Sequence, residues 1–180
     1  YSTYQAVSGS GVKGYKDLEE GLKGNTLLSA YPHPIANNVL PHIDIFMDNG
    51  YTKEEMKMIE ETRKILHNNK LRITSTAVRV PVFYSHSESI NVEFEKPYDI
   101  DDIFEIYEKE NGIILVDDVT KNNYPLAIDA AGTDEVYIGR IRRDYSLASG
   151  LNLWVVADNI RKGAATNTIQ IAEYLVDKVL

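Results

Sequence analysis

Arg79 and His86 are the residues whose types and spacing best suit chemistry. They stand seven positions apart, the arginine on a predicted strand and the histidine just beyond it. A guanidinium can hold a carboxylate through two parallel hydrogen bonds, and an imidazole can transfer protons near neutral pH. Taken alone, an arginine on a strand is more often a solvated charge, and a histidine at a strand end is more often structural.

Glu54 and Lys57 form a second candidate group. They lie three positions apart in the first turn of a predicted helix, on the side opposite its apolar stripe. A surface pair of this kind contributes only about 0.2–0.5 kcal/mol. In a pocket, the same two charges could clamp a zwitterion.

A polar strand end and a glycine-rich corner follow each other near the N-terminus. Gln5 directly precedes the corner, and its amide could either orient a substrate or pair with the backbone. The corner, Ser8-Gly9-Ser10-Gly11, lacks the spacing of a dinucleotide fingerprint or of a phosphate-binding loop, so it predicts a plain turn.

Several other chemistries find no support in the sequence. It contains no cysteine, which excludes disulfides, thiolate metal sites and a cysteine nucleophile supplied by this segment. No Gly-x-Ser-x-Gly motif is present to make Ser8 and His86 a serine hydrolase pair. We predict no metal site, because the four histidines do not follow a ligand spacing such as His-x-x-x-His: His33, His42, His67 and His86.

Composition predicts a folded body that acts on small molecules or protein surfaces. The 180 residues fit one domain, and 43% hydrophobic residues suffice for a buried core. A net charge of −8, with basic residues scattered except at 140–143, argues against nucleic-acid binding. Uncharged stretches such as 147–157 are shorter than the roughly 18–20 residues of a membrane span. The N-terminus has no initiating methionine and no signal sequence, so we expect the chain to begin within a longer protein.

Periodicity and capping signals predict an α+β layer fold. We expect strands at residues 1–7, 72–82, 87–94, 113–117, 135–142 and 151–157, and helices at 15–22, 52–66, 99–108 and from 163 onward. Strands that follow each other directly favour a mixed, largely antiparallel sheet with the helices packed on one face. The segment 31–40 contains two prolines and should be irregular.

Three of these elements carry more detailed expectations. Thr52 and Glu55 form a capping box, and Met56, Ile59 and Ile65 should face inward. Strands 72–82 and 87–94 should be antiparallel neighbours or a hairpin, with His86 at their junction. The last helix should lay one apolar stripe on the sheet: Ile169, Ala172, Leu175, Val176 and Val179.

Nine short stretches, taken together in this order, resemble the aspartate-semialdehyde dehydrogenase family. They are STYQAVSG (2–9), ID (43–44), GYTKEEMK (50–57), ETRKIL (61–66), RVPV (79–82), HSE (86–88), GRIR (139–142), GAA (163–165) and QIAE (170–173). The resemblance implies an NADP-dependent enzyme that interconverts L-aspartyl-4-phosphate and L-aspartate-4-semialdehyde through a cysteine thioester, in lysine, threonine and methionine biosynthesis.

The resemblance also implies roles for the residues that match. His86 would be the general acid–base, and Gln5 would orient the reacting carbonyl. Arg79 would hold the substrate α-carboxylate with its planar fork of donors. Glu54 would meet the substrate ammonium, and Lys57 would meet the phosphate.

Other implied properties concern the cofactor and the assembly. By analogy with related aldehyde dehydrogenases, Asn167 would touch the nicotinamide amide of NADP, with Ser8 and Gly9 nearby. The family's Asn-Cys nucleophile motif and its glycine fingerprint are absent from this sequence. Residues 1–180 would then be the substrate-binding and dimerisation domain of a cytoplasmic homodimer, with a glyceraldehyde-3-phosphate-dehydrogenase-like C-terminal fold, and inactive alone.

Two alternatives remain open. The missing cysteine favours, for this chain alone, a non-catalytic dimerisation module that uses the sheet face. A sister reductase acting on N-acetylglutamyl phosphate would share the architecture. Against the sister reductase, the set of Glu54, Lys57 and Arg79 suits a substrate with a free amino acid backbone.

Overall fold

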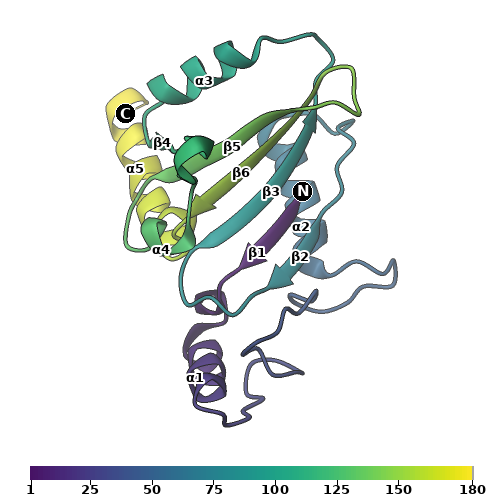
Figure 1. The fold of residues 1–180 in the computed structure, drawn as a ribbon, viewed down its shortest axis with the longest axis vertical. Helices are drawn as coiled ribbons and strands as arrows, with labels where there is room; N and C mark the ends of the chain where they lie inside the picture. Colours follow the sequence, from purple (N-terminus) through teal and green to yellow (C-terminus); the bar gives the residue numbers. More distant parts are fainter. Residues whose placement is uncertain (180) are drawn as a thin grey trace. The chain divides into compact units, whose positions relative to one another are not determined.

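The chain forms two compact units, Tyr1–Phe83 and Tyr84–Leu180, and the computed structural model describes residues 1–179 (Figure 1). The first unit contains β1 (Ser2–Gln5), the 3₁₀ turn η1 (Val7–Ser10), α1 (Gly11–Leu22), α2 (Lys53–Ile65) and β2 (Thr76–Arg79). The second contains β3 (His86–Glu93), α3 (Ile100–Lys109), β4 (Ile113–Leu115), η2 (Val119–Lys121), α4 (Ala127–Ala130), β5 (Val136–Asp144), β6 (Gly150–Ala157), the π-helical turn η3 (Arg161–Ala165) and α5 (Thr166–Lys178).

The first unit is built around two short parallel strands and an irregular segment that is buried. β1 and β2 pair in parallel, with Gln5 opposite Arg79 at the ends of the two strands. The predicted irregular segment 31–40 is confirmed, yet it supplies three of the five buried residues of a core. That core contains Val7, Leu18, Tyr31, Ile35 and Leu40. A loop that buries this much apolar surface is a structural element in its own right.

The capping box at the start of α2 is confirmed. The Thr52 side chain accepts from the Glu55 N–H, and the Glu55 carboxylate accepts from the Thr52 N–H. The helix ends at Ile65, and Ile59 is buried as predicted. Ile65 is not buried as predicted: its side chain at the C-terminal end of the helix is 72% exposed.

The second unit is a four-stranded mixed sheet in the order β3-β6-β5-β4. β6 pairs antiparallel with both β3 and β5, and β4 pairs in parallel with β5. α3 covers one face, where its apolar side and Tyr98 pack on Ile138, Ile141, Leu151 and Leu153. The predicted α+β class, with a largely antiparallel sheet, is confirmed.

The predicted hairpin between strands 72–82 and 87–94 is wrong. β2 pairs with β1, in parallel, and β3 pairs over its whole length with β6. The chain leaves the strand conformation between them because Pro81 has no N–H for a ladder and Ser85 has a φ of 70°, which lies in the left-handed region. His86 therefore begins a strand instead of closing a hairpin.

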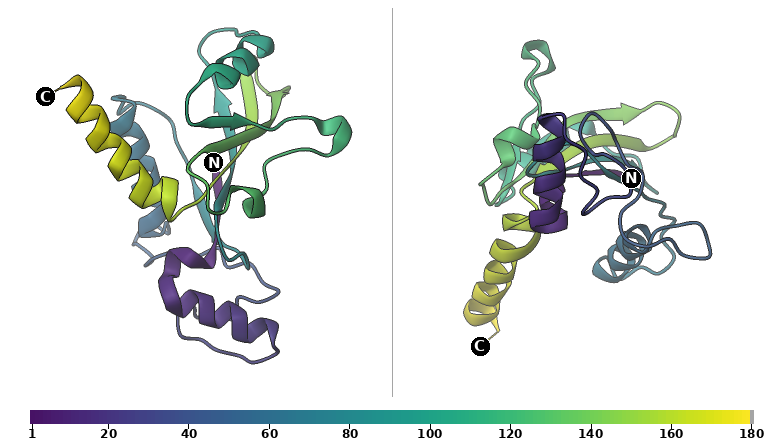
Figure 2. Two further views of the ribbon diagram at one scale, coloured as in Figure 1. Left: turned by 90° about the vertical axis from the view of Figure 1, so that its left-hand side faces the viewer. Right: turned by 90° about the horizontal axis from the view of Figure 1, so that it is seen from below.

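The predicted burial of the last helix on the sheet is also wrong. Its large apolar residues are 45% to 65% exposed among the described residues: Ile169, Leu175, Val176 and Val179. Ala172 is exposed as well. Within its unit, α5 projects away from the strands (Figure 2). It is anchored at η3, where Arg161 donates to both oxygens of Asp134 at 2.8 and 2.6 Å. The helical spacing of these apolar residues was predicted correctly, but spacing alone does not show whether another part of the protein packs on them.

Candidate active site

Arg79 is a buried cation with few protein partners. It is 5% exposed at the end of β2, and its backbone exchanges two hydrogen bonds with Leu40, at 2.8 and 2.9 Å. One terminal nitrogen, Nη1, donates to the Ala6 carbonyl at 2.6 Å, while Nε has no partner. Burial lowers the pKa of the guanidinium, and nearby Tyr31 and Glu54 raise it. Such a buried fork suits an anionic ligand, because a buried charge is stabilised by an opposite charge.

The first turn of α2 brings Glu54 and Lys57 beside Gln5 of β1. Gln5 Nε2 donates to Glu54 Oε1 at 3.2 Å, and Lys57 Nζ lies 3.7 Å from Glu54 Oε2. Gln5 is also the register partner of Arg79, so its amide links the Glu54 carboxylate of α2 to the strand pair that carries the guanidinium. This cluster has two positive charges and one negative charge.

Glu55 fixes the α2 turn against β2. In addition to closing the capping box, its carboxylate accepts from the Ala77 N–H at 3.0 Å, and its carbonyl accepts from the Ser75 hydroxyl at 2.9 Å. The sequence suggested only the capping role. The contact with Ala77, 22 positions along the chain, is what holds Glu54 and Lys57 beside the end of β2.

Tyr31 is a site neighbour that the sequence analysis missed. Its buried ring lies with its centroid 5.9 Å from Arg79 Cζ, within the range of a cation–π contact. The sequence gave no sign of this contact, because Tyr31 stands in a segment without periodicity, 48 positions from the arginine.

Ser8 and Gly9 lie in η1, not in an open loop. The Ser8 N–H donates to the Phe83 carbonyl at 3.2 Å, and the Gly9 N–H donates to the Ala6 carbonyl at 3.2 Å. Ser8 is buried, whereas Gly9 is exposed. Their cofactor roles stay predictions.

His86 and Asn167 belong to the second unit. His86 begins β3 opposite Ala157, and the preceding Ser85 N–H donates to Asn159 Oδ1 at 3.2 Å, which fixes the entry into the strand. Asn167 lies in the first turn of α5, and its Oδ1 accepts from Lys162 Nζ at 3.4 Å. With its oxygen so engaged, the Asn167 amide nitrogen can donate to a carbonyl ligand.

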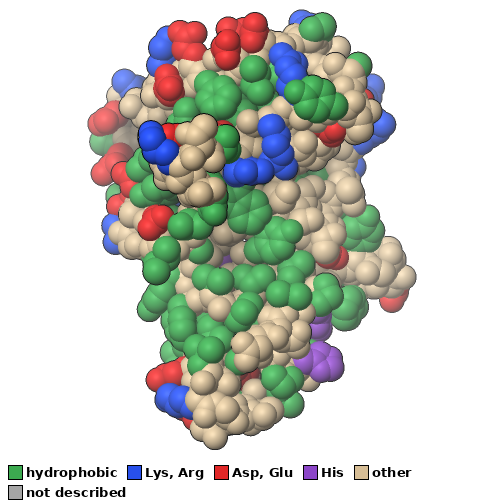
Figure 3. Space-filling view, in the orientation of Figure 1, with side chains coloured by type: hydrophobic (Ala, Val, Ile, Leu, Met, Phe, Trp, Pro, Cys, Tyr) green, Lys and Arg blue, Asp and Glu red, His purple; other side chains and the backbone are tan. Residues whose placement is uncertain are grey.

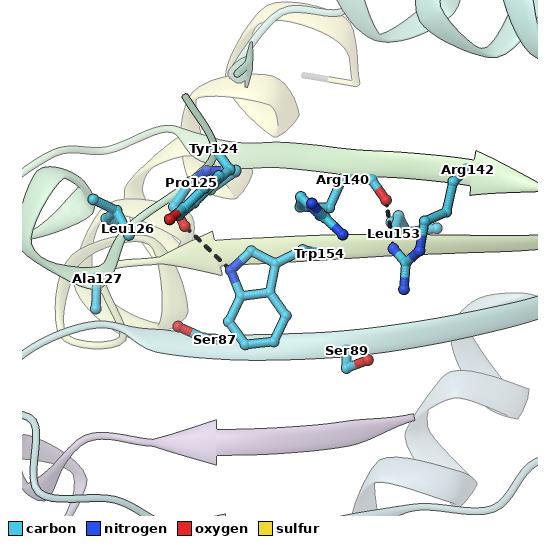
Figure 4. A pocket seen from close by; sticks show the side chains of 10 residues that line it. All are labelled: Ser87, Ser89, Tyr124, Pro125, Leu126, Ala127, Arg140, Arg142, Leu153 and Trp154. Carbon is cyan, nitrogen blue, oxygen red and sulfur yellow. Dashed lines mark hydrogen bonds between the residues drawn. The ribbon is translucent and has the colours of Figure 1, made fainter. Parts of the chain in front are cut away.

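The second unit also has a pocket of about 470 Å³ that the sequence analysis did not predict (Figure 4). It is lined by Arg140 and Arg142 of β5, Leu153 and Trp154 of β6, Ser87 and Ser89 of β3 and residues 124–127. Trp154 alternates with Leu153, which packs on the α3 side, so the pocket opens on the opposite face of the sheet. Basic and hydrophobic side chains gather over β5 and β6 in the space-filling view (Figure 3).

The described residues contain neither a cluster of metal-binding side chains nor a membrane-spanning helix. Within residues 1–179, no group of three or more His, Cys, Asp or Glu side chains is placed to hold a metal ion. Over the same residues, no helix has the length and apolar character needed to span a membrane.

Comparison with known proteins gives consistent matches. The family model for the semialdehyde dehydrogenase dimerisation domain matches residues 1–162. An aspartate-semialdehyde dehydrogenase of Aquifex aeolicus is 52% identical over 185 residues, which cover 99% of this chain and 54% of the relative. The chain thus spans about half the length of the curated relatives it matches.

Solved structures agree with the sequence matches. The crystal structure of aspartate semialdehyde dehydrogenase II from Vibrio cholerae, complexed with ASA, superposes with a TM-score of 0.93 at 46% identity. That match covers 99% of this chain and 54% of the other. The aspartate semialdehyde dehydrogenase from Candida albicans, solved with NADP, gives a TM-score of 0.68 at 25% identity, over 97% of this chain and 49% of the other.

Proposed function

Because the chain belongs to the semialdehyde dehydrogenase family, with the dimerisation domain over residues 1–162, we propose that it supplies substrate-binding and acid–base residues to an aspartate-semialdehyde dehydrogenase. The observation that carries the proposal is the buried, partly unpartnered guanidinium of Arg79 on the strand end that also bears the Gln5–Glu54 hydrogen bond. The Vibrio cholerae relative solved with ASA supports this choice of substrate.

Charge complementarity selects the substrate class. Arg79 binds the α-carboxylate, Glu54 binds the ammonium, and Lys57 binds the phosphate. The 3.7 Å contact between Glu54 and Lys57 can give way to substrate groups, because the lysine side chain is 56% exposed and such a pair is weak. An N-acylated substrate has no ammonium, so Glu54 would face a neutral amide. The free amino acid is therefore favoured over the N-acetylglutamyl phosphate alternative.

His86 acts as the acid–base group of the reaction. An imidazole accepts and returns a proton near neutral pH, which is the task when a thiol attacks and a thiohemiacetal collapses. The strand pairing and the Ser85–Asn159 hydrogen bond support this role, because they fix the backbone that carries the imidazole. Gln5 orients the reacting carbonyl of the substrate. Its hydrogen bond to Glu54 connects it to the residue that binds the substrate ammonium.

NADP would supply or accept the hydride when bound, as the NADP-containing Candida albicans structure suggests. On this chain, Asn167 would hold the nicotinamide carboxamide through its amide N–H, and Ser8 and Gly9 would be further contacts for the cofactor. The 3.4 Å bond from Lys162 to Asn167 supports the donor orientation. The products lead toward lysine, threonine and methionine.

The nucleophilic cysteine has to come from outside these 180 residues, since the sequence contains none. We expect the isolated chain to give no turnover with aspartate semialdehyde, NADP and phosphate. The same absence favours the alternative that this chain, taken alone, acts as a dimerisation module.

A second copy of the chain covers the sheet face opposite α3. Support comes from the dimerisation-domain match and from the pocket, where Arg140 and Arg142 form no ion pair with a carboxylate in the described part of the chain. Arg142 instead donates to the Arg140 carbonyl at 2.6 Å. Because a two-fold interface uses the same surface patch on both copies, these guanidiniums would pair with acceptors of the other copy.

The test uses a full-length protein that carries this chain. NADPH formation is followed with aspartate semialdehyde and phosphate in the wild type and in His86→Ala, with His33→Ala as the control for an exposed histidine. His86→Ala should lower kcat by about 10²–10⁴-fold, and His33→Ala should not. Unchanged turnover in His86→Ala would refute the acid–base assignment, and no turnover in the wild type would refute the proposed function.

A further inference from the structure

The contacts of Arg79 raise the question of what holds its guanidinium in place. The side chain comes from β2, which is only four residues long, and it is buried. In the described part of the chain, the guanidinium donates one hydrogen bond to the Ala6 carbonyl and lies over the face of the Tyr31 ring. Gln5 is the register partner of Arg79 and Glu54 is bonded to Gln5, but within residues 1–179 neither forms a hydrogen bond to the guanidinium. The Tyr31 ring and the Ala6 carbonyl are therefore the two groups that set the orientation of the guanidinium.

Tyr31 is itself firmly held. Its ring packs in the core of the first unit with Val7, Leu18 and Ile35. Burial raises the pKa of its hydroxyl, so at neutral pH the side chain is a neutral phenol, and its attraction for the guanidinium comes from the ring. A rigid, neutral aromatic face is suited to positioning a cation without neutralising it.

Asp17 fixes the turn that leads into Tyr31. This buried carboxylate of α1 accepts from the Ser29 N–H at 3.0 Å and the Ala30 N–H at 2.8 Å, and it also accepts from the Ser29 hydroxyl. Burial alone would raise the pKa of Asp17, but these hydrogen bonds outweigh it and lower the pKa. The carboxylate is thus charged at neutral pH and holds three donors of one turn.

Gly14 shows how close α1 comes to the same ring. A Cβ at this position would lie 2.5 Å from the Val7 carbonyl oxygen and 2.7 Å from the Tyr31 hydroxyl oxygen. Both distances are well below van der Waals contact, so only glycine permits this approach. The helix, the turn and the ring form one packed support behind Arg79.

We propose that Tyr31, fixed by Asp17, is a positioning residue that holds the Arg79 guanidinium in the orientation that binds the substrate carboxylate. The inference rests on the proposed function, because Arg79 must be the carboxylate ligand for the support to matter. Tyr31 itself does not touch the reacting atoms. Its effect is on the affinity for the carboxylate and not on the chemical step.

The test compares Tyr31→Leu with Tyr31→Phe in the full-length protein that carries this chain. Removing the ring forfeits the cation–π contact, which corresponds to about a 3- to 30-fold rise in KM for aspartate semialdehyde. The kcat and the KM for phosphate should stay near wild type. Tyr31→Phe keeps the ring and should recover the wild-type KM within about twofold. Tyr51→Leu, a tyrosine of the same unit whose hydroxyl contacts Thr74, is the matched control.

A purely structural role is separated by a double-mutant cycle. In an Arg79→Lys background, Tyr31→Leu should change KM by less than about twofold, since the contact it removes is already altered. If Tyr31→Leu raises KM equally in both backgrounds, or lowers kcat instead, the inference is overturned. Should Tyr31→Leu fail to fold, Asp17→Asn serves as the second variant. It should raise the same KM and leave kcat near wild type, and an unchanged KM would count against the inference.

Failure of this inference differs from failure of the proposed function. If Arg79→Lys leaves the KM for aspartate semialdehyde unchanged, Arg79 is not the carboxylate ligand and the proposed site is wrong. If Arg79→Lys raises that KM while Tyr31→Leu does not, the site stands and only the role of Tyr31 is lost.

Discussion

Replacing Glu55 by alanine should cost the chain several kcal/mol of folding free energy and disturb the candidate site. The carboxylate accepts from two buried backbone donors, the Thr52 N–H at 2.8 Å and the Ala77 N–H at 3.0 Å. Thr52 is 1% and Ala77 0% exposed, so neither donor has ready access to solvent. A buried donor left unsatisfied costs about 1–3 kcal/mol, which gives about 2–6 kcal/mol for the pair.

Glu55→Gln refines this estimate. The glutamine side chain keeps one acceptor oxygen, so it can satisfy only one of the two donors. Its cost should be about half that of alanine. Glu60→Ala is the matched control, because Glu60 lies exposed on the same helix and has no such contact. A change at that position should stay within about 0.5 kcal/mol.

The assay is equilibrium unfolding in urea, followed by circular dichroism, for the wild type and the three variants. The expected order of stability is wild type and Glu60→Ala together, then Glu55→Gln, then Glu55→Ala. In the full-length protein, Glu55→Ala should also raise the KM for substrate, because Glu54 and Lys57 share its helical turn. If Glu55→Ala proves no more destabilising than Glu60→Ala, the link between α2 and β2 does not hold the turn, and the reasoning fails.

Three further predictions follow from other contacts. Gly14→Ala should destabilise the chain by about 1–3 kcal/mol in the same unfolding assay, because its Cβ would meet the Val7 carbonyl at 2.5 Å; an unchanged midpoint would contradict the close approach. The pKa of Asp134 is lowered to about 2, chiefly by hydrogen bonding from Arg161, so the stabilisation is present above the unfolded pKa of about 4 and is lost as pH falls through 2. Asp134→Asn should flatten the stability–pH profile between about pH 4 and 2, and a profile that matches the wild type would rule this out. Arg142→Glu should weaken self-association at least about 10-fold by sedimentation, whereas Lys96→Glu should not; equal association of both variants would place the interface elsewhere.

Much of the fold followed from local patterns. The capping box at Thr52 and Glu55, the helix at 100–109 and the strands 136–144 and 150–157 were predicted to within two residues, because caps and periodicity act over a few positions. The pairing partners of the strands were not predicted correctly in every case. β2 pairs with β1 across more than 70 positions, and the sequence spacing favoured the nearer β3.

The amino-acid sequence by itself, through its resemblance to the family, determined which residues are candidates for the chemistry. Arg79, His86, Glu54 and Lys57 were proposed in this way, and the structure links two of them through Gln5, which is the register partner of Arg79 and donates to Glu54. Only the tertiary structure decided what supports them, because the Tyr31 ring and the Ala77 N–H become neighbours of Arg79 and Glu55 through chain folding over 48 and 22 positions. Local sequence rules reach a few residues along the chain, and contacts over such separations arise only when the packed core has formed.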